Sequence, residues 1–181
     1  PAGDSGSELA VRIAALLRDV PDFPQPGIVF KDITPLLADG DGFAATIGAL
    51  ASFARTVGPI DLVAGVEARG FLIAGALARA LDCGLVPVRK AGKLPPPTVK
   101  RAYQLEYATA EIEVPVGVLD GKRILLVDDV LATGGTLRAA IDLIGEAGGT
   151  VAGLGVLLEL GFLDGRAQLA DVGPLHALLR V

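Results

Sequence analysis

The segment Val127–Thr136, which reads VDDVLATGGT, holds the densest group of residues that could do chemistry. Its two adjacent carboxylates, Asp128 and Asp129, could hold sugar hydroxyls or an ion. The residues after them offer small side chains, two hydroxyls and backbone N–H groups at a predicted helix start, a combination suited to a phosphate group: Ala132, Thr133, Gly134, Gly135 and Thr136. One ligand that carries both a ribose and a phosphate would satisfy both halves of the segment.

The surrounding pattern predicts where this segment lies. The apolar run Arg123–Val127 predicts a buried strand, and residues 136–147 predict a helix, so the segment falls at the carboxyl end of a strand, where open parallel sheets bind ligands. The other elements follow the same alternation: helices at 5–20, 42–57 and 69–81, and strands at 61–66, 85–88, twice within 103–114, 151–158 and 175–179. The pattern predicts an α/β fold with a mainly parallel twisted sheet flanked by helices on both faces.

Length, composition and charge narrow the class of protein. A chain of 181 residues and 18.4 kDa fits one domain, 1–181, and a net charge of -5 disfavours broad binding to nucleic acid or to an anionic membrane. Cys83 and His176 are the single residues of their types, which excludes an intramolecular disulfide and nearly every histidine-dependent site. The N-terminal sequence lacks the basic start of a signal peptide, and we expect a cytoplasmic protein. We interpret Cys83 and His176 as structural.

Two other interpretations of VDDVLATGGT remain open. In the first, the two aspartates end a strand, the glycines form a tight turn and Thr136 caps a helix, with no ligand at all. In the second, the apolar run that ends in two aspartates is the metal-binding strand of a nucleotide hydrolase. That reading needs G-x-x-x-x-G-K-[ST], and neither this motif nor a G-x-G-x-x-G that opens a helix after a strand occurs in the chain.

Basic residues gather between the second and third predicted strands of the chain, at 89–101. No acidic residue interrupts this stretch, which could hold phosphates or be a solvated mobile loop: Arg89, Lys90, Lys93, Lys100 and Arg101. Arg69 opens a predicted helix, where a cation costs roughly 0.3–1 kcal/mol unless an anion offsets it. The alternative is that Arg69 pairs with Glu67 on the surface.

Several segments resemble the type I phosphoribosyltransferases and, among them, the adenine phosphoribosyltransferases. VDDVLATGGT is similar to the family's phosphoribosyl diphosphate (PRPP) binding signature. Four further segments match in order and spacing over nearly the whole chain: FPQPGIVFKDITPLL at 23–37, GVEARGF at 65–71, RKAGKLP at 89–95 and YQLEY at 103–107. The resemblance implies the fold of that family, with a small hood and a flexible β-hairpin loop.

The resemblance also implies a reaction and its residues. The reaction is transfer of the 5-phosphoribosyl group from PRPP to N9 of adenine, giving AMP and diphosphate in purine salvage. Asp128 and Asp129 would orient the ribose, and residues 132–136 would anchor the 5′-phosphate. Arg69 and the segment that contains Arg89, Lys90 and Lys93 would face the diphosphate. Mg²⁺ would be required, held mainly through PRPP rather than by side chains, and the family expectation is a homodimer.

For the base, the resemblance implies binding by Val29, Phe30 and Lys31. Phe30 lies in a loop stiffened by prolines and could stack on the flat purine, whereas we expect Phe23 in the same loop to belong to the core. Glu106 and Tyr107 fall in the segment that would close over the reaction, with Glu106 as the candidate for holding the purine proton. The alternative interpretation is that Glu106 is an exposed side chain on a β-hairpin, because polar and apolar residues alternate in LEYATAEIEV as they do in a strand.

Two rival functions belong to the same resemblance. A sister enzyme would use hypoxanthine, guanine, xanthine or another base, and Val29–Lys31 would decide between them. A non-catalytic PRPP sensor would regulate DNA, but it would need an added DNA-binding domain, and the acidic charge disfavours it. We therefore expect PRPP and adenine as partners, with no nucleic acid and no membrane.

Overall fold

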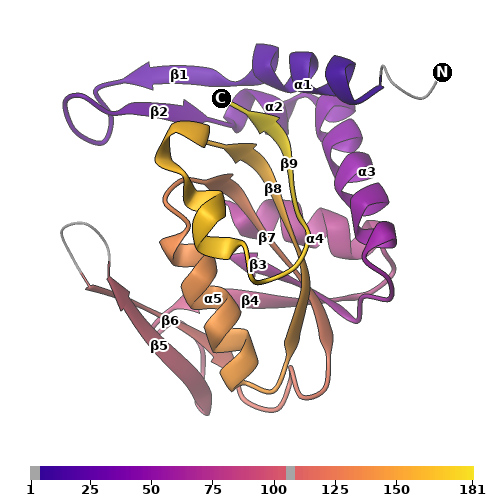
Figure 1. Cartoon of the computed structure of the whole chain (residues 1–181), viewed down its shortest axis with the longest axis vertical. Helices are drawn as coiled ribbons and strands as arrows, with labels where there is room; N and C mark the ends of the chain where they lie inside the picture. Colours follow the sequence, from indigo (N-terminus) through magenta and orange to yellow (C-terminus); the bar gives the residue numbers. More distant parts are fainter. Residues whose placement is uncertain (1–4, 105–108) are drawn as a thin grey trace.

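A seven-stranded sheet forms the centre of the molecule in the computed structural model, which describes residues 5–104 and 109–181 (Figure 1). Its spatial order is β5-β6-β4-β3-β7-β8-β9, and the strands from β4 to β9 in that order pair in parallel. The bounds of the strands are β3 (Leu62–Val66), β4 (Gly84–Lys90), β5 (Thr98–Gln104), β6 (Thr109–Pro115), β7 (Arg123–Leu131), β8 (Thr150–Glu159) and β9 (Leu175–Arg180). The mainly parallel sheet that the sequence predicts is confirmed.

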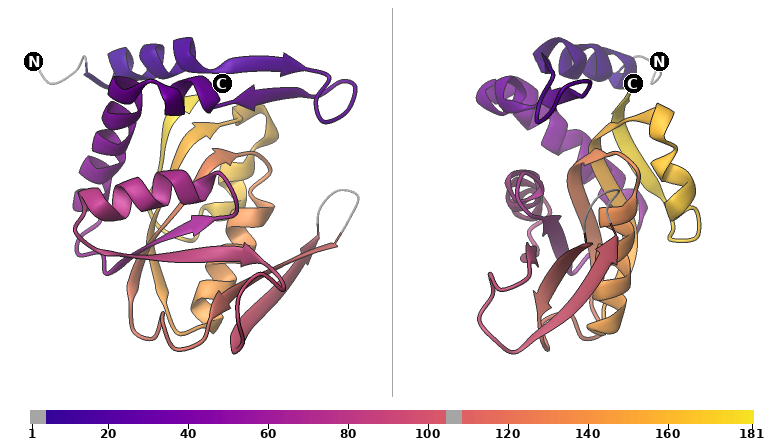
Figure 2. Two further views of the ribbon diagram at one scale, coloured as in Figure 1. Left: turned by 180° about the vertical axis from the view of Figure 1, so that it is seen from behind. Right: turned by 90° about the vertical axis from the view of Figure 1, so that its left-hand side faces the viewer.

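Helices cover both faces of this sheet. In the right-hand view of Figure 2, α4 (Gly70–Ala80) lies on one side of the sheet and α5 (Gly135–Glu146) on the other. Each face has its own buried apolar cluster, one containing Leu77 of α4 and one containing Leu143 of α5. On the α4 side lie also α1 (Ser5–Leu16), α2 (Thr34–Ala38) and α3 (Gly40–Thr56). None of the described helices is long and apolar enough to cross a membrane.

A separate antiparallel ribbon extends above the sheet (Figure 1). It consists of β1 (Arg18–Pro21) and β2 (Val29–Asp32), with Val20 opposite Phe30. The predicted helix up to Val20 is wrong, because the helix ends at Leu16 and the next residues pair with β2. A salt bridge of 2.6 Å between Arg18 Nη2 and Asp32 Oδ2 fixes the register, so cross-strand pairing overrides the helical spacing of apolar residues.

Three other predictions differ from the structure. β5 begins at Thr98, five residues before the predicted strand, because its partner β6 offers a full antiparallel ladder from Thr98↔Pro115 to Gln104↔Thr109. β7 runs through both aspartates to Leu131 instead of ending at Val127, since β8 pairs with it as far as Glu159. Phe23 is 50% exposed and is not a core residue, and its ring meets the ring of Phe30 in the same ribbon edge to face.

After β8, the chain makes two short 3-10 turns before it reaches β9. These are η1 (Gly161–Leu163) and η2 (Gly165–Leu169), which the sequence analysis did not predict. Figure 1 shows them in yellow beside α5. The turns therefore lie next to the segment that follows β7.

Candidate functional site

Asp128 and Asp129 lie near the carboxyl end of β7 and point to different neighbours. Asp129 is buried and faces the start of α4, whereas Asp128 lines a cavity with the residues that follow the strand. The Asp129 backbone N–H donates to Asp128 Oδ1 at 2.8 Å. Burial raises the pKa of Asp128 well above its usual range, and the negative charge of Asp129 raises it further. A ligand hydroxyl or cation at this carboxylate would compensate the charge that the site disfavours.

The segment Ala132–Thr136, called the 132–136 loop below, runs from the end of β7 into the first turn of α5 and surrounds a cavity of about 80 Å³ together with Asp128. Gly134 is the residue before α5, with φ of +87°, a conformation that glycine adopts without the steric cost of a Cβ. No side chain caps this helix start, so the alternative interpretation in which Thr136 caps the helix is not what the structure contains. The first N–H groups of the helix lack intrahelical partners, and an anion in the cavity would accept from them.

Arg69 joins the two sides of the site. It precedes α4, and its Nε lies 2.8 Å from Asp129 Oδ2. The contact brings opposite charges together without hydrogen-bond geometry, since Arg69 Nη1 and Asp129 Oδ2 are buried and neither forms a hydrogen bond with a described residue. The alternative pairing of Arg69 with Glu67 is not what the structure contains. Two unsatisfied buried polar atoms in one place favour a polar ligand there.

Phe30 brings an aromatic ring to the same place. The Arg69 guanidinium carbon lies 4.8 Å from the centroid of the Phe30 ring, within the range of a cation–π contact. Phe23 meets Phe30 edge to face with centroids 5.1 Å apart, which fixes the orientation of the Phe30 ring. An aromatic surface therefore adjoins the arginine that contacts Asp129.

Val29 and Lys31 lie beside Phe30 in β2 but face a different space. Both line an apolar cavity of about 620 Å³ between the β1–β2 ribbon and the η1 region, and Phe30 does not line it. Lys31 Nζ donates to both carboxylate oxygens of Asp19, at 2.7 and 2.9 Å. The two-residue alternation of a strand thus separates the three predicted base-binding residues into two faces.

The predicted basic stretch is divided by its ion pairs. Arg89 Nε lies 3.2 Å from Glu67 Oε2, which also accepts from the backbone N–H of Lys90 at 2.9 Å. The Lys90 hydrogen bond and the nearby arginine lower the pKa of Glu67. Arg101 instead contacts α5 through Asp142 and Glu146.

The turn that carries Lys93 has a carboxylate anchor. Glu113 of β6, with a side chain only 1% exposed, accepts from the backbone N–H groups of Lys93 and Leu94 at 2.7 and 2.8 Å. Burial alone would raise the pKa of Glu113, but these two hydrogen bonds outweigh it and the pKa is lowered. Within the described ranges, the ammonium groups of Lys90 and Lys93 form no ion pair, which leaves both available to an anionic ligand.

Sequence reasoning missed the carboxylates that hold this basic segment. Glu113 lies between Ile112 and Val114, and a charged residue inside an apolar strand is a signal of a buried role. Glu67 carries no comparable signal, because its partners Arg89 and Lys90 are distant in the sequence and meet it only where β3 and β4 pair.

Of the three residues predicted to be catalytic, Arg69 is described above and the other two are Glu106 and Tyr107. Glu106 and Tyr107 lie outside the described residues. Among residues 5–104 and 109–181, no group of three His, Cys, Asp or Glu side chains is placed to hold a metal ion. Mg²⁺ usually retains water and uses one or two carboxylates plus substrate phosphates, so this donor set fits a magnesium ion that arrives with a diphosphate.

Comparisons with known proteins agree on one family. The family described as "Phosphoribosyl transferase domain" matches residues 36–172. The chain is 56% identical to the adenine phosphoribosyltransferase of Thermobifida fusca over 97% of this chain and 99% of that protein. A crystal structure of the Rhodothermus marinus adenine phosphoribosyltransferase is similar with a TM-score of 0.91 and 45% identity, covering 97% of this chain and 99% of the other.

A third comparison includes bound ligands. The Saccharomyces cerevisiae adenine phosphoribosyltransferase, solved with D-2,5-dideoxy-2,5-imino-altritol 1,6-bisphosphate and adenine, is similar with a TM-score of 0.88 and 35% identity. The similarity covers 95% of this chain and 99% of that one.

Proposed function

The chain belongs to the phosphoribosyltransferase family, as one of its adenine phosphoribosyltransferases, and from that premise we propose how its residues carry the reaction. The enzyme transfers the 5-phosphoribosyl group of PRPP to N9 of adenine in purine salvage, and the products are AMP and diphosphate. The single observation that carries the residue assignment is the contact series Phe30–Arg69–Asp129 beside the 132–136 loop. It supports adjacent places for a base, a ribose and a phosphate.

The ribose phosphate occupies the end of β7 in this proposal. The backbone N–H groups of Ala132–Thr136 and the hydroxyls of Thr133 and Thr136 bind the 5′-phosphate in the cavity that Asp128 also lines. Asp128 and Asp129 accept from the ribose hydroxyls. The raised pKa of Asp128 supports this role, because a hydroxyl donor compensates a carboxylate whose charge burial and Asp129 disfavour.

The leaving diphosphate faces the basic side chains. Arg69 offers its unsatisfied Nη1, and Arg89, Lys90 and Lys93 complete the cationic wall. Glu67 and Glu113 hold the backbone of that wall in place through Lys90, Lys93 and Leu94. These charges favour the transition state because the diphosphate gains negative charge as its bond to the anomeric carbon breaks.

Adenine stacks on Phe30, on the side that faces Arg69. Only this side of β2 adjoins the proposed ribose site, and N9 must reach the anomeric carbon. Val29 and Lys31 contribute through the strand backbone and through the shape of the adjoining cavity. Lys31 is fixed by Asp19, which supports a positional role for its side chain.

Proton transfer and closure are assigned to Glu106 and Tyr107, as the family resemblance implies. As the bond from N9 to the anomeric carbon forms, N9 loses its proton, and Glu106 holds that proton. Exclusion of water matters here, since water competes with adenine for the oxocarbenium-like centre. In the sequence, both residues lie between the end of β5 at Gln104 and the start of β6 at Thr109.

Magnesium completes the proposal as a cofactor. Mg²⁺ would be held mainly through PRPP rather than by side chains, and when bound it would supply neutralisation of charge on the leaving group. We also carry over from the family a homodimer, a cytoplasmic location and a single domain over residues 1–181.

The test uses the purified chain with PRPP, Mg²⁺ and each common nucleobase in turn, followed by measurement of nucleotide and diphosphate. AMP from adenine, with no product from the other bases and no turnover with excess EDTA, is the expected result. Turnover with a different base only would overturn the Phe30 assignment while retaining the PRPP site. Binding of PRPP without any product would favour a sensor over an enzyme.

A further inference from the structure

The 132–136 loop rests directly on the backbone of η2. A Cβ built on Gly165 would lie 2.1 Å from the carbonyl oxygen of Ala132 and 2.9 Å from the carbonyl carbon of Thr133. In the other direction, a Cβ on Gly134 would lie 2.6 Å from the carbonyl oxygen of Gly165. Two glycines thus allow two backbones to touch, and the position of Gly165 determines how far the loop can relax away from its ligand.

An ion pair between the half-exposed Arg166 and a buried carboxylate determines the position of Gly165. Glu159, the last residue of β8, has a side chain only 2% exposed. Arg166, which follows Gly165, donates to Glu159 through Nε at 3.1 Å and through Nη2 at 2.5 Å. The Arg166 hydrogen bond lowers the pKa of Glu159, so the pair is charged at neutral pH.

Arg166 makes further contacts besides its ion pair with Glu159, and we call this set of contacts the Arg166 clamp. Its Nη1 donates to the carbonyl oxygen of Leu175 at 3.1 Å, at the start of β9. Leu169, at the end of η2, is buried in the same apolar cluster as Leu137 of α5. One guanidinium therefore links β8, β9 and the turn that supports the loop. The pairing of Leu131 with Glu159 in the sheet places this clamp level with the end of β7.

The chemistry of phosphate binding explains why such support matters. The loop binds mainly through backbone N–H groups, whose directions depend on the backbone alone. The cavity's other lining residues are three apolar residues and the acidic Asp128, so no cationic side chain of its lining can compensate for a displaced loop. A misplacement of about 1 Å in a preorganised site costs on the order of 100-fold in rate.

We propose that Glu159 and Arg166 are positioning residues for the 5′-phosphate, acting through Gly165 on the backbone of Ala132–Gly134. Neither residue touches substrate. The inference rests on the proposed role of the 132–136 loop as the phosphate site. It predicts a defect specific to ligands that carry the 5′-phosphate, whereas a purely structural pair would change only stability.

The test compares Glu159→Gln, Arg166→Lys and Gly165→Ala with the unchanged chain. Each protein is assayed well below its Tm for kcat and for the KM of PRPP and of adenine, and ribose 5-phosphate is titrated by calorimetry without adenine. We expect the KM of PRPP and the Kd of ribose 5-phosphate to rise by about tenfold or more in each variant. The KM of adenine should stay within about twofold.

Arg180→Gln is the matched control. Arg180 also approaches Glu159, at 3.5 Å, but its side chain is largely exposed and it does not adjoin Gly165 in the chain. This variant should retain the unchanged chain's Kd for ribose 5-phosphate. Arg166→Lys retains the positive charge and loses the fork, so a defect there assigns the effect to geometry.

Each remaining outcome decides the question. Lower Tm with an unchanged Kd for ribose 5-phosphate in all three variants would make the pair merely structural. If Glu159→Gln does not fold, Arg166→Lys decides, because it alters the geometry of the pair and keeps the positive charge opposite the buried carboxylate. If the unchanged chain itself neither binds ribose 5-phosphate nor consumes PRPP, the proposed function fails, and the inference fails with it. Normal behaviour of the unchanged chain with normal variants overturns the inference alone.

Discussion

Arg69 Nε lies 2.8 Å from Asp129 Oδ2, and this ion pair joins the start of α4 to the end of β7. The arginine occupies a helix start, an unfavourable place for a cation, and the buried carboxylate offsets that cost. The same guanidinium faces the Phe30 ring and retains one unsatisfied nitrogen. Arg69 is thus the residue through which the proposed base, ribose and diphosphate places meet.

Replacement of Arg69 by lysine tests this arrangement. Lysine retains the positive charge but lacks the guanidinium fork. In Arg69, one nitrogen of that fork contacts Asp129 and another remains to donate to an anion. We expect the KM of PRPP to rise about tenfold or more, with diphosphate inhibition weakened in parallel. Steady-state kinetics with product inhibition measures both. Arg79→Lys, at an exposed arginine near the other end of α4, is the control and should change neither.

Asp128→Asn should separate stability from activity. The raised pKa of Asp128 means that the folded state disfavours its charge, so the neutral amide should stabilise the protein by about 1 kcal/mol at pH 7. That corresponds to roughly 2–4 °C in Tm for a chain of this size. Turnover should fall by about tenfold or more, because the amide is a weaker acceptor for a ribose hydroxyl.

The pH dependence of that stabilisation has a definite sign. A carboxyl group whose folded pKa is raised binds its proton more tightly in the folded state, so the unchanged chain gains stability relative to the variant as the pH falls. The Tm difference should therefore be larger at pH 8 than at pH 5. A variant that is less stable than the unchanged chain at pH 8 would contradict the assignment. Asp41→Asn, at a 95% exposed side chain, is the control.

Phe30 and Phe23 form a matched pair for the base site. Both lie in the β1–β2 ribbon region and their rings are in contact, but only Phe30 faces Arg69. Phe30→Leu should raise the KM of adenine about fivefold or more and leave the KM of PRPP nearly unchanged, since base stacking on an aromatic ring contributes roughly 1–3 kcal/mol. Phe23→Leu should have a smaller effect on adenine. Equal effects of the two replacements would place the purine elsewhere.

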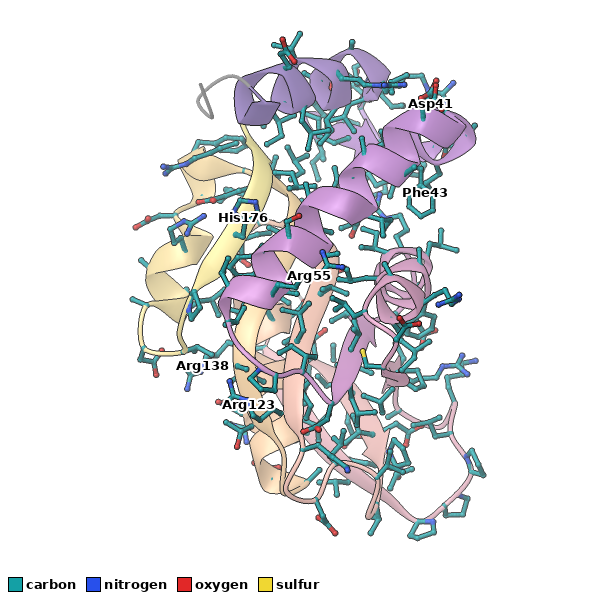
Figure 3. The ribbon with its side chains drawn as sticks, turned by 90° about the vertical axis from the view of Figure 1, so that its right-hand side faces the viewer. Asp41, Phe43, Arg55, Arg123, Arg138 and His176 are labelled. Atoms are coloured by element: carbon teal, nitrogen blue, oxygen red, sulfur yellow. The ribbon has the colours of Figure 1, made fainter. Side chains whose placement is uncertain are left out.

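His176 offers a titration free of overlap, because it is the single histidine of the chain. It lies on β9 beside α3, as Figure 3 shows, and its ring stacks on Phe53 with centroids 5.0 Å apart. Partial burial lowers the pKa of His176, and the positive charge of Arg166 lowers it further. Proton NMR should give a midpoint below 6.5 for the imidazole in the folded chain.

The linked effect on stability follows from that direction. With a depressed folded pKa, the unfolded chain binds the proton more tightly, so His176 costs stability as the pH falls through 6.5 towards the folded pKa. His176→Gln should remove that part of the pH dependence while kcat stays the same. A folded-state midpoint at or above 6.5 would show that the stacked environment does not disfavour the charge.

The sequence by itself determined the class of fold and singled out the segment for which we propose phosphate binding. Apolar strands alternating with helices are local patterns, and they require a mainly parallel sheet whatever the details of packing. The possible chemistry of VDDVLATGGT could be predicted in the same way. Two carboxylates carry negative charge, and a glycine-rich helix start offers backbone N–H groups, whatever surrounds them. The α/β architecture was therefore predicted from local information alone, and the structure confirms it.

Only the tertiary structure decided which partners these residues have. Asp129 meets Arg69, Glu67 meets Arg89, and Glu159 meets Arg166 through chain crossings or turns that no spacing rule specifies. The ribbon formed by β1 and β2 replaced part of a predicted helix because the residues of β1 pair with the next strand along the chain, a contact that helical spacing does not take into account. Local patterns fix what a segment can form, whereas pairing, burial and charge neutralisation between distant segments fix what it contacts.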